Sequence, residues 1–185
     1  SYFARAWGEA LNAYVLPTLP FNTSEEHSAF RGTITVRPAT VMLMLEEVVG
    51  VLREQGFRKQ VLTVGHGGSY WMPAFIKQIN HQFKDIVLVS AHQGGDDLWV
   101  QALEHAGLGG RSELHGGAQS RALALFLAPG SVSDGAYGRE IPEAMMEYAD
   151  YVGWEKITPD GSWGRYGDGD ADTARRLQRC RDAAA

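Results

Sequence analysis

The segment at residues 61–69, which reads Val-Leu-Thr-Val-Gly-His-Gly-Gly-Ser, constrains the possible fold more than any other part of the chain. An apolar, β-branched run stops at a Gly-His-Gly-Gly corner, and helical sequence follows from Ser69. In open α/β sheets, a corner of this kind lies at the carboxyl end of a strand, where ligands bind. The glycines let the backbone pass close to a ligand, and we expect His66 to point into the crevice.

The clearest helix follows Pro38, a residue that suits a first helical position. Apolar residues repeat at helical spacing on one of its faces: Val41, Leu45, Val48 and Leu52. Gly56 is placed to end this helix as its C-terminal cap. The pattern predicts a helix with one face packed on a core.

Two strands are expected on either side of a second helix. The strands cover residues 60–64 and 86–89, and the helix covers residues 70–84 with Ser69 as its N-cap. The second strand has no alternation, which predicts burial on both faces. Other expected elements are helices at 2–13, 97–105, 118–127 and from 170 onward, and a strand at 14–16. This alternation predicts one α/β domain over residues 1–185, with a parallel sheet covered by helices.

Composition argues against several classes of function. The formal net charge of -5 argues against a nucleic-acid binder, and no apolar run is long enough to predict a membrane span. The single cysteine, Cys180, forms no internal disulfide, which fits the cytoplasmic location we expect. The chain begins at Ser1 rather than Met, so we expect that its N-terminus is incomplete.

Two of the six histidines, His66 and His115, sit in Gly-rich corners beside a helix start. Neutral imidazole is a common ligand of transition metals and the commonest general base near neutral pH. The alternative is that each is a loop histidine bonded to backbone. His92 and the pair at 96–97 flank another glycine pair, where Asp96 is expected to cap a helix.

The loop at residues 21–32 carries Glu25, Glu26 and His27, a carboxylate–imidazole cluster in a stretch that is too polar for a core. Such a cluster can bind metal or move protons, but it can also be a solvated turn or a subunit contact. Arg121 is expected to be a solvated helix residue; the alternative is that its guanidinium pairs with an anionic ligand. Four tryptophans are expected to fill core rather than to line a pocket: Trp71, Trp99, Trp154 and Trp163.

Four motifs, in order along the chain, resemble the creatininase family of creatinine amidohydrolases. Residues 19–34 resemble the family's Pro-Tyr-Gly, Glu-His and Phe-Pro-Gly-Thr-Ile loop, and residues 56–69 resemble its helix, strand and Asn-Gly-His-x-x-Asn unit. Residues 114–117 resemble its His-Ala-Gly motif, and residues 161–164 resemble its C-terminal Gly-x-x-Gly-Asp stretch. The resemblance covers nearly the whole chain.

This resemblance implies an αβα sandwich with a central, mostly parallel sheet. It implies hydrolysis of a small cyclic or linear amide by two divalent metals, zinc or manganese, in a homo-oligomer that is commonly a hexamer. By position, His66 matches a metal ligand, and His115 matches a catalytic pocket histidine that assists proton transfer or substrate binding. The other residues carried over, as substrate-binding or supporting positions, are Glu25, Glu26, His27, Gly67, Gly68 and Ser69.

The chain also departs from the family pattern. The family's Glu-x-His and Asp ligands precede the first helix, where this chain begins, and a further carboxylate position holds Gly68, or else Ala118 or Ser120. These departures favour the alternative of a catalytically degenerate relative that serves as a binding or assembly subunit. A sheet that lacks a strand would also expose edges that favour association.

Overall fold

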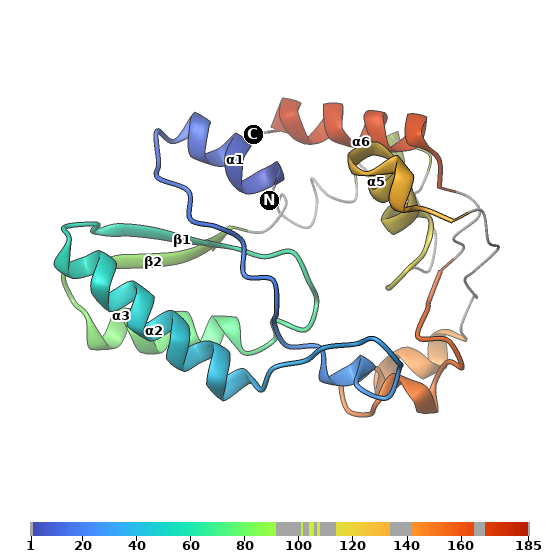
Figure 1. Ribbon diagram of the computed structural model, residues 1–185, viewed down its shortest axis with the longest axis horizontal. Coiled ribbons are helices and arrows are strands. Elements are labelled where there is room, and N and C mark those ends of the chain that lie inside the picture. The colour runs from blue at the N-terminus through green and yellow to red at the C-terminus, as the bar shows by residue number, and fades with distance from the viewer. Residues whose placement is uncertain are drawn as a thin grey trace. The chain divides into compact units, whose positions relative to one another are not determined.

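A computed structural model describes residues 2–91, 114–133, 142–164 and 169–184, together with Gln101, Glu104, His105 and Gly107. The chain forms two compact units (Figure 1). The first contains Ser1–Glu25 and Ile34–Gln93, and the second contains Glu26–Thr33 and Gly94–Ala185. Outside the described residues lie most of the helix expected at 97–105 and these four residues: His92, Asp96, Asp97 and Trp99.

The first unit is built on two parallel strands. β1 (Lys59–Thr63) and β2 (Val87–Ala91) pair so that Lys59 lies opposite Val87 and Thr63 opposite Ala91. The unit also contains α1 (Tyr2–Ala10), α2 (Pro38–Glu54) and α3 (Met72–Gln82). The parallel pairing is that of an α/β fold, as the sequence predicts.

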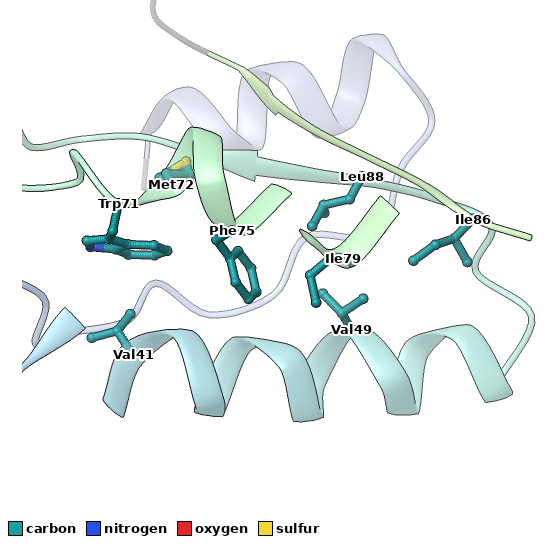
Figure 2. Close-up of a cluster of buried hydrophobic side chains, with 8 residues drawn as sticks. All are labelled: Val41, Val49, Trp71, Met72, Phe75, Ile79, Ile86 and Leu88. Atoms are coloured by element: carbon teal, nitrogen blue, oxygen red, sulfur yellow. The ribbon is translucent and has the colours of Figure 1, made fainter. Parts of the chain in front are cut away.

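One apolar core joins α2, α3 and β2 (Figure 2). Figure 2 shows Phe75 and Ile79 of α3 and Leu88 of β2 facing Val49 of α2. Each large apolar side chain buried here stabilises the unit by about 1.5–3 kcal/mol. The buried members are Val41, Val49, Trp71, Met72, Phe75, Ile79, Ile86 and Leu88. This core fixes the corner that connects β1 to α3.

α2 follows its sequence prediction closely. Pro38 opens the helix, and Gly56 follows its end with φ +96°, a conformation that glycine adopts without steric cost. The backbone N–H groups of Gly56 and Phe57 donate to the last carbonyls of the helix. Of the predicted stripe, Val41 is fully buried, and the other members are half-buried.

Burial of β2 on both faces is a wrong prediction. Leu88 is 1% exposed, whereas Val87 and Val89 are 57% and 45% exposed. The strand therefore alternates, because the core of α2 and α3 covers the face that carries Leu88. An unbroken apolar run does not reveal how many faces of a strand are covered.

Two local predictions in the first unit are also wrong. Residues 14–16 form no strand, and Tyr14 is 75% exposed, with its ring centroid 6.5 Å from that of Phe57. Ser69 does not cap α3, which begins at Met72 with Trp71 as its N-cap residue. Instead, the backbone carbonyl of Ser69 accepts the N–H of Met72.

The second unit contains helices joined by turns. α5 (Ala118–Leu127) has the predicted bounds and contacts α6 (Ala171–Ala184). Short 3-10 turns, most of them in this unit, are η1 (Glu25–His27), η2 (Pro129–Ser131), η3 (Glu143–Tyr148) and η4 (Trp154–Lys156). Arg121 is not a solvated residue, since it is half-buried and its guanidinium donates to the carbonyl of Gly169.

Trp154 and Trp163 form the apolar centre of the second unit, and Phe30 packs against them. Together with buried Trp71 of the first unit, they confirm that these tryptophans fill core. Among the residues that the structure describes, no helix has the length and apolar character needed to cross a membrane.

Candidate functional site

The Gly-His-Gly-Gly corner follows β1 in the first unit. The ring of His66 is half-buried, and its Nδ1 accepts the backbone N–H of Gly68 at 3.1 Å. A neutral imidazole carries its proton on one nitrogen and accepts at the other, so this bond places the proton on Nε2. Nε2 is a metal donor only in the other tautomer, in which Nδ1 carries the proton and the bond from Gly68 is lost.

The corner is held by the loop at residues 22–25. The hydroxyl of Thr23, a residue only 1% exposed, donates to the carbonyl of Gly68 and accepts the indole N–H of Trp71 at 3.0 Å. Glu25 accepts the phenol O–H of Tyr70 at 2.8 Å. The loop and the first turn before α3 therefore fix each other through side-chain hydrogen bonds.

Gly68 lies where this loop approaches most closely. A Cβ at this position would collide with the backbone carbonyl oxygen of Thr23 and would lie 3.0 Å from Nδ1 of His66. The next residue, Ser69, is buried and lies 3.5 Å from the side-chain amide of Asn22. A carboxylate at position 68, as the family pattern has it, therefore has no room in this arrangement.

The described residues do not fit a two-metal site. Among them, no three His, Cys, Asp or Glu side chains converge to hold an ion, whereas a catalytic zinc needs about three protein ligands. Of the ligands that such a site needs, His66 is a candidate for one. The metal role predicted for His66 stays a prediction, and binding at Nε2 requires the change of tautomer described above.

The second unit brings two histidines into direct contact. The ring centroids of His27 and His115 lie 4.1 Å apart at an interplanar angle of 63°. The ring of Trp154 lies 4.7 Å from His27 and 5.8 Å from His115, and Phe30 lies 6.0 Å from His27. We call His27, His115 and Trp154, together with Glu26, the imidazole cluster.

Backbone structure holds His115 in this cluster. Residues 115 and 163 form an isolated antiparallel bridge, in which His115 N–H donates to Trp163 at 3.1 Å and Trp163 N–H donates back at 2.7 Å. Gly116 follows with φ +67°, a turn conformation that favours glycine. Because Trp163 is fully buried, the bridge fixes the position of His115 against a rigid core.

A carboxylate lies beside the more buried imidazole of the cluster. Oε1 of Glu26 lies 3.8 Å from Nδ1 of His27, and the His27 side chain is largely buried. At 3.8 Å, these two atoms lie beyond ordinary hydrogen-bond distance. The cluster therefore gathers a carboxylate and two imidazoles, which are side chains of the kinds that serve as general acids and bases.

The predicted site residues divide between the two units. His66, Gly67, Gly68, Ser69 and Glu25 belong to the first, and Glu26, His27 and His115 to the second. The structure brings His27 against His115, and it brings Glu25 onto Tyr70.

Local sequence does not predict the positions of three residues in the corner and the imidazole cluster: Thr23, His27 and Trp154. The buried hydroxyl of Thr23 and the 3-10 turn that buries His27 both lie in a loop expected to be too polar for core. The proximity of Trp154 to both histidines is a long-range contact without a local sequence signal.

Comparison with known proteins identifies relatives. A family model for creatinine amidohydrolase, named Creatininase, matches residues 1–185. Among curated proteins, none matches this chain in sequence. A creatininase variant with a tryptophan-to-phenylalanine substitution has a TM-score of 0.74 at 19% identity, over 98% of this chain and 77% of that one.

Two further creatininase structures are similar. A Zn-Zn type of a glutamate-to-glutamine variant gives a TM-score of 0.71 at 18% identity, over 98% of this chain and 78% of that chain. A manganese creatininase has a TM-score of 0.71 at 19% identity, over 95% of this chain and 74% of that chain. At these identities, the structural likeness establishes the fold.

Proposed function

The chain belongs to the creatininase family, and on that premise we propose that it is an amidohydrolase that acts on a small cyclic or linear amide. The observation that carries the proposal is the imidazole cluster. It places a half-buried histidine, His115, beside a second imidazole and a tryptophan on a rigid backbone bridge.

The reaction requires a proton transfer that His115 can perform. In amide hydrolysis, the oxygen of water bonds to the carbonyl carbon, the carbon–nitrogen bond breaks, and one proton moves from the water to the leaving nitrogen. A neutral imidazole accepts that proton and then donates it, which typically contributes about 10²–10⁴-fold to the rate. Trp154, a core residue of the second unit, packs beside the imidazole of His115.

Zinc or manganese is the cofactor that the proposal adopts, because the similar structures include a Zn-Zn type and a manganese form. His66 is the residue proposed as a ligand. Since the described residues do not complete a site, the steps assigned to this chain are substrate binding and proton transfer.

The test is an assay of amide hydrolysis on creatinine and on linear amides, with added zinc or manganese. We expect His115→Asn to lower kcat by about 10²–10⁴-fold. His81→Gln changes an exposed histidine late in α3 and serves as the matched control, which should keep wild-type activity. Full activity in His115→Asn, or no hydrolysis of any amide by the wild type, would overturn the proposal.

A second candidate function is a binding or assembly subunit that has lost hydrolysis. It is favoured by the packing at Gly68, where the backbone of Thr23 fills the space a carboxylate side chain would need. Calorimetric titration with zinc and with manganese separates the two candidates. Saturable binding that His66→Ala abolishes supports the enzyme, and absence of specific binding supports the subunit.

A further inference from the structure

We propose that Asn80 of α3 guards the outer edge of β2, where its side-chain amide takes the place of a neighbouring strand. The guard keeps the apolar segment at residues 86–91 from pairing with the same segment in a second copy of the chain. This role concerns assembly, so it goes beyond the proposed function and does not depend on any reaction.

The ladder between the two strands shows which backbone groups of β2 point away from β1. The N–H of Val87 donates to the carbonyl of Arg58 at 2.8 Å, and the carbonyl of Ala91 accepts the N–H of Val64 at 3.4 Å. Successive residues of a strand turn their N–H and C=O groups to opposite edges of that strand. Since residues 87 and 91 bond to β1, Leu88 directs both of its backbone groups to the outer edge.

One side chain satisfies both of these outward groups. Nδ2 of Asn80 donates to the carbonyl of Leu88, and Oδ1 of Asn80 accepts the N–H of Leu88, each at 2.8 Å. A primary amide has the same N–H donor and C=O acceptor that the peptide group of an adjacent strand offers. Asn80 therefore completes the hydrogen bonding of this edge at the position where another strand would bond.

The core of the first unit holds the amide in place. Ile79, the preceding residue of α3, is fully buried, and Figure 2 shows it facing Val49 of α2. Leu88 is only 1% exposed. Because packing fixes both partners, their hydrogen bonds form with little further loss of conformational entropy. Asparagine favours caps and turns over helix interiors, so its bonds to β2 account for its place inside α3.

The guarded segment has a composition that favours pairing between chains. Residues 86–91 read Ile-Val-Leu-Val-Ser-Ala, without a charged residue, a proline or a glycine. Short uncharged segments of high β-propensity are those that pair with copies of themselves. Val87 and Val89 are 57% and 45% exposed, so solvent reaches this strand. An open edge on such a strand is a template for association unless a side chain or a neighbouring element blocks it.

Two substitutions of Asn80 in the full chain test the guard. Asn80→Asp keeps the shape and the acceptor for the Leu88 N–H but removes the donor, so the Leu88 carbonyl faces a carboxylate. Asn80→Leu removes both hydrogen-bond partners. Sedimentation velocity of either variant should show species larger than the wild-type assembly. The concentration at which such species appear should be at least about tenfold lower than for the wild type.

Hydrogen exchange at the Leu88 amide, measured in dilute protein, separates the two bonds. In Asn80→Leu, this amide loses its acceptor and should exchange at least about tenfold faster, relative to the Ile79 amide of the same core. In Asn80→Asp, it keeps an acceptor, and its relative rate should stay close to that of the wild type. An unchanged rate in Asn80→Leu would show that Asn80 does not hold this edge and would overturn the proposal.

Loss of stability by itself also promotes association, and Val49→Ala is the matched control for that effect. It removes buried apolar volume from the same core and leaves Asn80 and the edge intact. At an equal loss of unfolding free energy, set with denaturant, Val49→Ala should keep the wild-type assembly. If it forms the same larger species as the Asn80 variants, unfolding and not an open edge produces them, and the proposal is wrong.

A second substitution tests whether β2 is the strand that pairs. Val89→Lys places a positive charge on β2 in every copy, and like charges on paired strands repel each other. The double variant Asn80→Leu with Val89→Lys should therefore lose the larger species that Asn80→Leu alone forms. Larger species that persist in the double variant would mean that the copies join elsewhere, which contradicts a guard at this edge.

Discussion

At the scale of single residues, Gly68 is the tightest point of the candidate site. A methyl group there would meet the backbone of Thr23, whereas one at Gly67 would meet no atom within 4 Å. We therefore expect Gly68→Ala to lower the free energy of unfolding by about 1–3 kcal/mol, the usual range for overpacking. Gly67→Ala is the matched control and should change it by less than about 0.5 kcal/mol. Chemical denaturation measures both, and equal effects would contradict the packing argument.

The same scale shows where sequence reasoning stops. The Gly-His-Gly-Gly pattern predicts a corner after a strand, and the corner is there, because backbone chemistry acts locally. The burial of Thr23 and His27 depends on Gly68, Trp71, Phe30 and Trp154, most of which lie far away in the chain. No local pattern encodes such distant partners. A polar loop that contributes side chains to the core therefore has the same composition as a polar loop that lies in solvent.

At the scale of elements, β2 offers a sharp contrast between neighbouring positions. Leu88 is buried in the core of the first unit, and Val87 is largely exposed on the other face. We expect Leu88→Ala to cost about 2–5 kcal/mol of unfolding free energy, because it leaves a cavity among Phe75, Ile79 and their neighbours. Val87→Ala should cost less than about 1 kcal/mol. Urea unfolding of both variants checks this, and a comparable loss in Val87→Ala would show that the face is covered.

The N-terminus of α6 makes a second element-scale prediction. The carboxylate of Asp170 accepts the backbone N–H of Thr173 at 2.6 Å, and chiefly this bond lowers the pKa of Asp170. Because the folded pKa is lowered, the charge-dependent stabilisation is complete above the unfolded value, about 3.9, and is lost as the pH falls through the folded pKa. Asp170→Ala should cost about 1 kcal/mol at neutral pH.

Asp170→Asn is the matched variant for the pH dependence of this cap. Asparagine caps helices about as well as aspartate but does not titrate. The difference in unfolding free energy between the wild type and this variant should therefore shrink as the pH is lowered below about 4. Denaturation curves at several pH values measure it, and a constant difference would refute the assignment.

Helices are easier to predict than strands in this chain, for a physical reason. α2 and α5 carry their signals within a few residues, as a proline start, a glycine end or an apolar period. The exposure of β2 depends on what covers each face of a sheet, and residues 14–16 have apolar sequence without a pairing partner. Sequence near a strand does not contain that information.

At the scale of the whole molecule, the fold is the α/β fold of the creatininase family, which the order of the four motifs along the chain predicts. The order of the motifs combines several local sequence patterns into one prediction of the fold. It does not predict that Glu26–Thr33 joins the second unit while the residues on both sides join the first. That assignment depends on the burial of His27 and on the packing of Phe30 against Trp154 and Trp163.

The exposed apolar surface of the first unit predicts self-association. Val87 and Val89 lie exposed on β2, and in the described part of the chain the two strands pair only with each other. Open strand edges and exposed apolar faces favour contacts between copies, in line with the homo-oligomer proposed from the family resemblance. Sedimentation velocity over a range of concentrations should therefore show an oligomer, with a hexamer as the expected size.

A paired substitution tests whether this face carries the association. The double variant Val87→Lys with Val89→Lys places two charges on the face, and the dissociation constant should rise at least about tenfold, equal to about 1.4 kcal/mol. Tyr148→Lys changes an exposed aromatic residue of the second unit and should leave the constant unchanged. A wild type that stays monomeric at every concentration would refute association, and equal weakening by both variants would place the contact elsewhere. Val87 and Val89 alternate along β2 with the buried Leu88. If the double lysine variant loses assembly but keeps its unfolding free energy, the two valines belong to the interface and not to the core.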